Sequence, residues 1–256
     1  MSLDKSIKEA NVFVFDTSEQ LALAAAQRFV DYSHASILDH NLFSVSLAGG
    51  QTPRRVYELL ASEPFNSAVA WPSVHLFFGD ERCVPPDNPE SNYGMVYSTL
   101  ISKIPIPPNN VHRIIGESDA AGSAELYEKE LKSFFAKQSL PRFDLVLLGL
   151  GEDSHTASLF PGTDTLGEKA RWVVKTRAPG LKQDRITLTI PVFNHAARVM
   201  FLITGSRKAR PLADVLLGPK RPDGLLPAQA IGPLNGTLEW LIDRQAGSYL
   251  ESTPVR

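Results

Sequence analysis

Short hydrophobic segments alternate with amphipathic ones along most of the chain. Five of the short segments are almost continuously hydrophobic, which is typical of strands that are buried on both faces of a sheet. They span residues 43–48, 74–78, 144–150, 186–190 and 199–204. Because helical patterns lie between them, the sequence predicts an α/β fold with a mainly parallel sheet.

Two of the amphipathic segments begin with recognisable helix signals. Thr17 and Gln20 have the spacing of a capping box. Thr52 and Pro53 are predicted to be the N-cap and the first residue of the next helix. Three later helices are expected over residues 91–101, 120–137 and 206–217.

Length and charge narrow the class of protein. The 256 residues lie near the upper limit for one hydrophobic core, so a single domain over residues 1–256 is expected. Lys and Arg total 26 against 28 Asp and Glu, and no basic run is present, so a nucleic-acid partner is not expected. No segment approaches the ~20 consecutive apolar residues of a membrane span. The single cysteine, Cys83, suits a reducing compartment, and we expect a cytoplasmic protein.

Ligands of parallel α/β sheets bind beyond the carboxyl ends of the strands, so the loops that follow the strands are the first places to search. In the first loop, Gly49 and Gly50 allow the backbone to approach a ligand closely, and the following helix offers free N–H groups. Thr52 adds a hydroxyl group. These features suit a phosphate, although a strand-to-helix turn that needs glycine only for its geometry has the same pattern.

The second loop carries three consecutive charges, Asp80, Glu81 and Arg82, directly after a hydrophobic strand. Neighbouring carboxylates in an extended segment point in opposite directions, so they do not form a glycosidase pair. Arg82 is the better candidate for binding an oxyanion or a phosphate, and Asp80 or Glu81 is expected to hold it in place. The alternative is a solvated charged turn.

The third loop places His155 beside Asp153 and Ser154, after the strand predicted over residues 144–150. Histidine is well suited to act as a general base near neutral pH. A dinucleotide fingerprint is a poor match, because Ser154 stands where its last glycine belongs. A nucleophile elbow around Ser154 lacks both glycines, and neither of the usual zinc motifs is present.

Taken together and in this order, the segments resemble the 6-phosphogluconolactonase family, whose members are pentose-phosphate relatives of the glucosamine-6-phosphate deaminases. The resemblance runs from about residue 12 to residue 244. It rests on the segments SLAGGQTPRRVYELLA, FFGDERCVPPDNPESNYGM, FDLVLLGLGEDSHTASLFPGT, RITLTIPVFNHAARVMFLITGSRKA and LPAQAI.

The resemblance implies a three-layer α/β domain with an open sheet and helices on both faces. It also implies hydrolysis of the δ-lactone of 6-phosphogluconate without a cofactor or a metal. The family's active-site histidine falls on His155, and the arginine of its D-E-R segment falls on Arg82. The phosphate-binding residues fall on Gly49, Gly50, Thr52, Arg185 and Lys208.

Two positions depart from the usual family pattern. Gln51 replaces the serine of the Gly-Gly-Ser-Thr turn, where its amide and its backbone N–H can still donate hydrogen bonds. Ser154 replaces the glycine of Asp-Gly-His. If this position has a positive φ, serine there costs on the order of 1 kcal/mol.

The expected mechanism uses His155 as the base that activates water against the lactone carbonyl. Asp153 is expected to orient His155 or support it electrostatically, and Arg82 to stabilise the oxyanion or position the substrate. One alternative is a glucosamine-6-phosphate deaminase, but the Asn-Glu pair that follows the histidine in those enzymes is missing here. Another is a non-catalytic sugar-phosphate sensor. The oligomeric state is left open by the sequence, with a monomer favoured.

Overall fold

The computed structural model describes residues 11–136, 138–178, 180, 183–219 and 226–250. Within these residues, a seven-stranded sheet has the order β1-β10-β9-β6-β2-β3-β5. All neighbouring strands in it are parallel. The strands are β1 (Val12–Phe15), β2 (Phe43–Leu47), β3 (Val74–Phe78), β5 (Val111–His112), β6 (Leu145–Leu148), β9 (Arg198–Ile203) and β10 (Thr237–Asp243).

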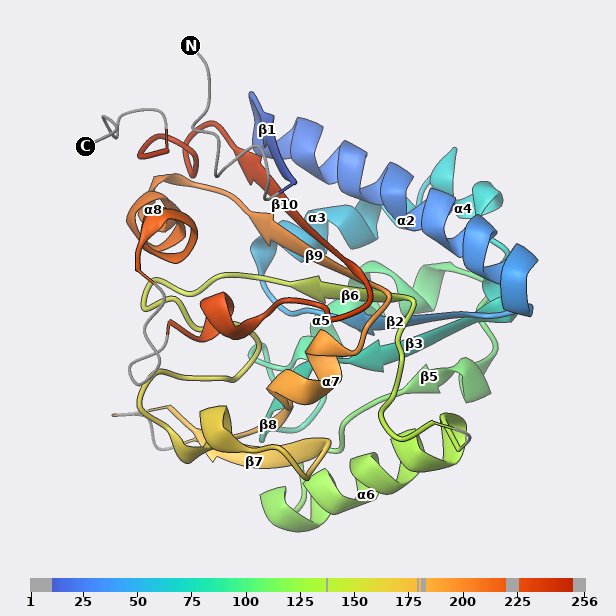
Figure 1. Ribbon diagram of the computed structural model, residues 1–256. Coiled ribbons are helices and arrows are strands. Elements are labelled where there is room, and N and C mark those ends of the chain that lie inside the picture. Colours follow the sequence, from blue (N-terminus) through green and yellow to red (C-terminus); the bar gives the residue numbers. More distant parts are fainter. Residues whose placement is uncertain (1–10, 137, 179, 181–182, 220–225, 251–256) are drawn as a thin grey trace.

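Helices cover both faces of this sheet, which confirms the predicted three-layer α/β fold. On one side, α2 packs against α3 and α3 packs against α5, whereas α7 lies on the other side of the strands (Figure 1). The α-helices are α2 (Ser18–His40), α3 (Gln51–Leu60), α4 (Phe65–Ala68), α5 (Asn92–Thr99), α6 (Ala120–Phe134), α7 (Ile190–Asn194) and α8 (Ala209–Leu217). The 3-10 helices are η1 (Trp71–Ser73), η2 (Ile101–Lys103), η3 (Pro108–Asn110), η4 (Asp164–Gly167), η5 (Ser206–Lys208) and η6 (Pro227–Ala230).

A second, antiparallel sheet has the order β4-β8-β7. Its strands are β4 (Asp80–Arg82), β7 (Val173–Arg177) and β8 (Asp184–Leu188). The segment predicted over residues 186–190 is therefore a strand, but it does not belong to the parallel sheet. Helix α6 packs against β7 and β8. Burial under this helix makes the segment as hydrophobic as a central parallel strand, so composition does not separate the two cases.

The start of α2 agrees with the prediction, and the start of α3 does not. Thr17 is the N-cap of α2, and its hydroxyl accepts a hydrogen bond from the Gln20 N–H at 3.2 Å. The N-cap of α3 is Gly50, with φ of 106°, so the predicted N-cap at Thr52 is wrong. Because glycine adopts this backbone conformation without strain, Gly50 can serve as the N-cap. The helix therefore begins at Gln51, two residues before the predicted start at Pro53.

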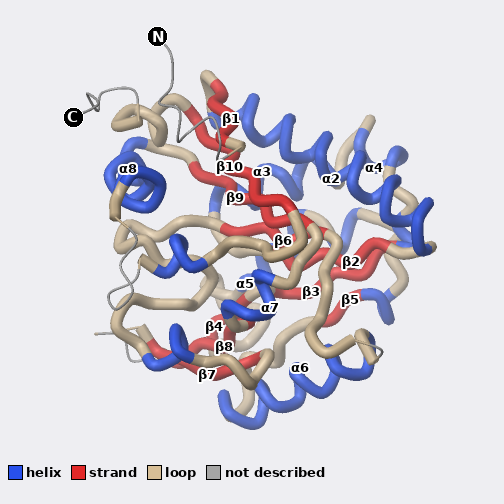
Figure 2. Tube along the Cα trace, in the orientation of Figure 1, coloured by secondary structure: helices blue, strands red, loops and turns tan. Residues whose placement is uncertain are grey.

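The later helices are all present but shorter than predicted, and Lys137 lies outside the described residues. Every residue of β2 and of β6 is buried, which accounts for their continuous hydrophobic pattern. The carboxyl ends of the central strands face a region of long loops between the two sheets (Figure 2). In the described part of the chain, no helix is both long enough and apolar enough to span a membrane.

Candidate active site

A cleft of about 780 Å³ lies at the carboxyl ends of the parallel strands, and all three of the predicted loops contribute to it. The Gly49–Gly50 turn follows β2, Arg82 lies on β4 beyond β3, and His155 lies in the loop after β6. The other described residues lining the cleft are Ala48, Asp80, Asn92, Gly149, Leu150, Gly151, Glu152, Asp153, Ala157, Phe160, Pro161, Ala178 and Lys208.

His155 and Asp153 form a tight pair in this cleft. Asp153 Oδ1 lies 2.5 Å from His155 Nδ1 and also accepts the His155 backbone N–H at 3.1 Å. Burial by itself raises the pKa of Asp153, but the charge and hydrogen bonds of His155 outweigh it and lower that pKa. Because Nδ1 is engaged by the carboxylate, Nε2 is the ring nitrogen left to exchange a proton with a ligand.

The loop bends sharply to bring these two residues together. Ser154 has a φ of 66° and Ala157 a φ of 48°. Position 154 therefore has the positive φ at which a serine is strained. The loop closes through a hydrogen bond from the Gly151 N–H to the His155 carbonyl at 2.7 Å. A Cβ on Gly151 would lie only 2.1 Å from His155 Nδ1, so the pair packs directly on this glycine.

Arg82 and Arg185 lie side by side on adjacent strands of the second sheet. They are direct partners in the antiparallel pairing of β4 with β8. Burial, and next to it the charge of Arg82, lower the pKa of the Arg185 guanidinium. The Nε atoms of both arginines are buried and have no hydrogen-bond partner among the residues that the structure describes. Two neighbouring cations with unused donors form a site that an anion would stabilise.

Glu81 holds the backbone of Arg82, because Glu81 Oε1 accepts the Arg82 N–H at 2.7 Å. The guanidinium is held differently from the prediction: among the described residues it donates to the Glu90 carbonyl and forms no ion pair with Asp80 or Glu81. The buried side chain of Glu81 also accepts hydrogen bonds from the segment at the start of α5. Burial raises the pKa of Glu81, although three backbone N–H groups oppose this effect.

The Gly-Gly turn lies against α5. A Cβ on Gly49 would come within 1.9 Å of Asn92 Oδ1, so only glycine fits here. Gln51 lines a neighbouring cavity of about 490 Å³ that shares Gly50, Arg82 and Asn92 with the cleft. Thr52 does not line the cleft, and its hydroxyl is hydrogen-bonded to the Thr204 hydroxyl at 2.7 Å.

Lys208, at the N-cap of α8, also lines the cleft. Burial lowers the pKa of Lys208, and nearby Glu152 partly counteracts this effect. Of the nine predicted site residues, six therefore line the cleft: Gly49, Gly50, Arg82, Asp153, His155 and Lys208. Gln51, Thr52 and Arg185 lie just outside it.

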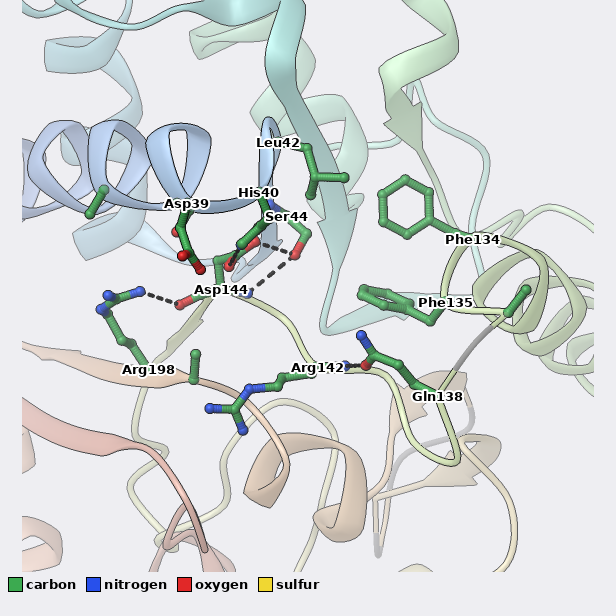
Figure 3. Close-up of a pocket in the computed structure, with 14 residues that line it drawn as sticks. Asp39, His40, Leu42, Ser44, Phe134, Phe135, Gln138, Arg142, Asp144 and Arg198 are labelled. Carbon is green, nitrogen blue, oxygen red and sulfur yellow. Dashed lines mark hydrogen bonds and ion pairs between the residues drawn. The ribbon is translucent and has the colours of Figure 1, made fainter.

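A larger cavity of about 1030 Å³ lies at the opposite edge of the sheet, where β2, β6 and β9 begin (Figure 3). Ser44, Asp144 and His40 meet there, but both Ser44 Oγ at 2.7 Å and His40 Nε2 at 2.9 Å bind the carboxylate. An activated serine needs a base beside its hydroxyl, and here the hydroxyl faces Asp144. In the described part of this cavity, His40 therefore contacts the carboxylate and not the serine hydroxyl, which differs from the order of a Ser-His-Asp triad.

The fold places the cleft where α/β enzymes bind their ligands, and the cationic side chains in it suit a small anionic substrate. Residues 16–240 match the family described as glucosamine-6-phosphate isomerases/6-phosphogluconolactonase, and the chain belongs to this family. It is 39% identical over 218 residues to a 6-phosphogluconolactonase of Synechocystis sp., covering 84% of this chain and 88% of the relative. A 6-phosphogluconolactonase of Haemophilus influenzae is 36% identical over 236 residues, covering 92% of this chain and 98% of the relative.

The solved structures include a close match in shape. The 6-phosphogluconolactonase from Trypanosoma cruzi has a TM-score of 0.81 and 30% sequence identity, and the match covers 97% of each chain. The similarity of fold therefore extends over nearly the whole chain.

Proposed function

We propose that this protein hydrolyses 6-phospho-D-glucono-1,5-lactone to 6-phosphogluconate, a step of the oxidative pentose-phosphate pathway. The observation that carries the proposal is the meeting of the His155–Asp153 pair and three cationic side chains around one cleft, in a chain that belongs to this family. The cations are Arg82, its neighbour Arg185, and Lys208.

In the proposed reaction, His155 acts as the general base. Its Nε2 takes a proton from a water molecule as the water oxygen attacks the lactone carbonyl. The C–O bond to the ring oxygen then breaks, and the imidazolium returns the proton to that oxygen as the ring opens. Asp153 orients the imidazole through Nδ1 and stabilises its positive charge.

Arg82 stabilises the oxyanion that develops on the carbonyl or positions the substrate for attack. The phosphate is held by Gly49, Gly50, Gln51, Thr52, Arg185 and Lys208. Because the Thr52 hydroxyl is paired with Thr204 and Thr52 is the second residue of α3, its contribution comes from its backbone N–H. The unused Nε donors of Arg82 and Arg185 support an anion beside the second sheet.

The test is to generate the phosphorylated lactone in situ and follow its loss with and without protein, with unphosphorylated gluconolactone alongside. Strong acceleration of the phosphorylated lactone is expected, and weak acceleration of the other. Equal acceleration of both would refute the phosphate-binding roles. Failure to accelerate either lactone would refute the lactonase, and release of ammonia from glucosamine 6-phosphate would then indicate the deaminase.

The proposed enzyme acts as a cytoplasmic monomer. Activity that elutes with the monomer in gel filtration is the expected result.

A further inference from the structure

Asp80 lies where the three loops of the cleft meet. Its side chain is buried, with 7% of its surface exposed. Oδ1 accepts a hydrogen bond from Asn92 Nδ2 at 3.2 Å, and Oδ2 accepts one from Ser158 Oγ at 2.6 Å. Each carboxylate oxygen is thus held by a residue from a different segment of the chain.

The Asn92 contact reaches the phosphate turn. Asn92 Nδ2 also donates to the Asp80 carbonyl at 2.9 Å, so the amide is fixed at two points on β4. Its Oδ1 lies against Gly49, where no Cβ would fit. The Asn92 side chain is therefore a spacer between β4 and the Gly49–Gly50 turn.

The Ser158 contact reaches the loop of the catalytic histidine. Ser158 is fully buried and lies three residues beyond His155, just after Ala157 in its strained conformation. Its hydroxyl is tied to Asp80, and its backbone N–H points to the Thr187 hydroxyl at 3.4 Å. The hydrogen bond from Ser158 thus ties the far side of this loop to β4.

The neighbouring carboxylate makes the junction rigid. Glu81 accepts hydrogen bonds from the backbone N–H groups of Asn92 at 2.8 Å and Tyr93 at 2.7 Å. The hydroxyl of Ser91 donates to it at 3.1 Å. Because these bonds fix the backbone at Asn92, its amide has little freedom to adjust if either contact is lost.

From these contacts we infer that Asp80, Asn92 and Ser158 are positioning residues of the cleft, with two separable effects. Asn92 positions the phosphate turn and so determines the preference for a phosphorylated substrate. Ser158 positions the loop of His155 and so determines turnover. The inference rests on the proposed lactonase function. Its kinetic test requires lactone turnover, whereas its binding test requires only that the same cleft binds 6-phosphogluconate.

Asn92→Ala is expected to raise KM for 6-phosphogluconolactone at least tenfold. Its kcat/KM for unphosphorylated gluconolactone should stay within threefold of the wild type, so the preference for phosphate falls about tenfold. Ser158→Ala is expected to lower kcat about tenfold for both lactones, which leaves the preference unchanged. A tenfold change in rate or affinity corresponds to about 1.4 kcal/mol, which is the size of the net contribution of one hydrogen bond.

Matched controls separate positioning from simple destabilisation. Asn110 is also a buried asparagine, whose Nδ2 donates to the Pro72 and Val74 carbonyls at 3.0 Å, away from the cleft. Ser33 is a buried serine that donates to the Val30 carbonyl at 2.8 Å. Asn110→Ala and Ser33→Ala are expected to lower the stability but to leave kcat, KM and the phosphate preference unchanged.

Equal losses on both lactones in Asn92→Ala, or an unchanged kcat in Ser158→Ala, would overturn the inference. Calorimetric titration with 6-phosphogluconate provides a second readout that needs no turnover. Asn92→Ala should weaken this binding about tenfold, and Ser158→Ala should not change it. A wild type that binds 6-phosphogluconate but hydrolyses no lactone would refute the proposed function, and the binding of the Asn92→Ala protein would still decide the inference on the phosphate turn.

Discussion

Replacing Gly151 by alanine tests whether the packing of the His155–Asp153 pair controls catalysis. The added Cβ would lie 2.1 Å from His155 Nδ1, 2.4 Å from Cε1 and 2.7 Å from Asp153 Oδ1. Atoms do not approach this closely, so the imidazole has to move by about 1 Å, and the hydrogen bond to Asp153 is stretched or lost. The methyl group therefore acts on the proposed base itself.

The expected effect is large for activity and small for stability. A displacement of about 1 Å costs about 100-fold in rate, within the 10²–10⁴-fold that general base catalysis contributes. The His155 side chain is 34% exposed and has room to turn outward without disturbing the core. The free energy of unfolding should therefore change by no more than about 1 kcal/mol, which corresponds to a shift in Tm of about 2–4 °C.

The assay compares kcat on 6-phosphogluconolactone and Tm for Gly151→Ala with those of Gly167→Ala. A Cβ on Gly167 meets no heavy atom within 4 Å, and Gly167 does not line the cleft. The control is expected to match the wild type in both measurements. If Gly151→Ala kept more than a third of the wild-type kcat while remaining folded, the assignment of His155 as a precisely held base would be refuted.

Three other changes test the charges and buried contacts. Asp153→Asn should lower kcat about tenfold with little change in KM, because a neutral amide no longer orients the imidazole as the carboxylate does or stabilises the imidazolium that forms during the reaction; an unchanged kcat would argue against the orienting role. Burial, and then His112, lower the pKa of His75 to about 4. Between about pH 4 and 6.5, the unfolded chain binds a proton at His75 more readily than the native state does. The free energy of unfolding, measured with urea, should therefore fall as the pH drops from about 6.5 to 4. An equally steep fall in the His75→Gln protein would contradict this. Asp144→Ala leaves the buried Ser44 donors unpaired and should destabilise by about 2–4 kcal/mol without changing kcat, which chemical denaturation and the lactone assay measure together.

The central strands could be predicted from the sequence because burial on both faces leaves a continuous hydrophobic pattern. The peripheral strands could not. β1 is a hydrophobic run of only four residues, and β5 has only two residues. Charged or polar residues interrupt β7 and β10, which were not predicted either. β4 continues from β3 past Gly79, and its charged residues looked like part of a loop.

The candidate site could be predicted in part from the sequence. The motifs placed His155, Arg82 and the Gly49–Gly50 turn, because each follows a predicted strand. Of the two carboxylates expected to hold Arg82, Glu81 binds its backbone N–H, whereas Asp80 binds Asn92 and Ser158, and Asn92 was overlooked. Hydrogen bonds across the fold define the roles of Asp80 and Asn92, including one between Ser158 and Asp80, which are 78 positions apart.

The sequence by itself therefore determined the layered α/β fold, the edge of the sheet that carries the site, and the chemical groups available there. These depend on local hydrophobic periodicity and on residue type, which the order of amino acids states directly. Only the tertiary structure decided which groups meet. The pairing of β4 with β8 brings Arg185 opposite Arg82, and two residues with positive φ bend the loop that joins His155 to Asp153. Such contacts depend on strand register and loop conformation, and these are set by the packing of the whole chain.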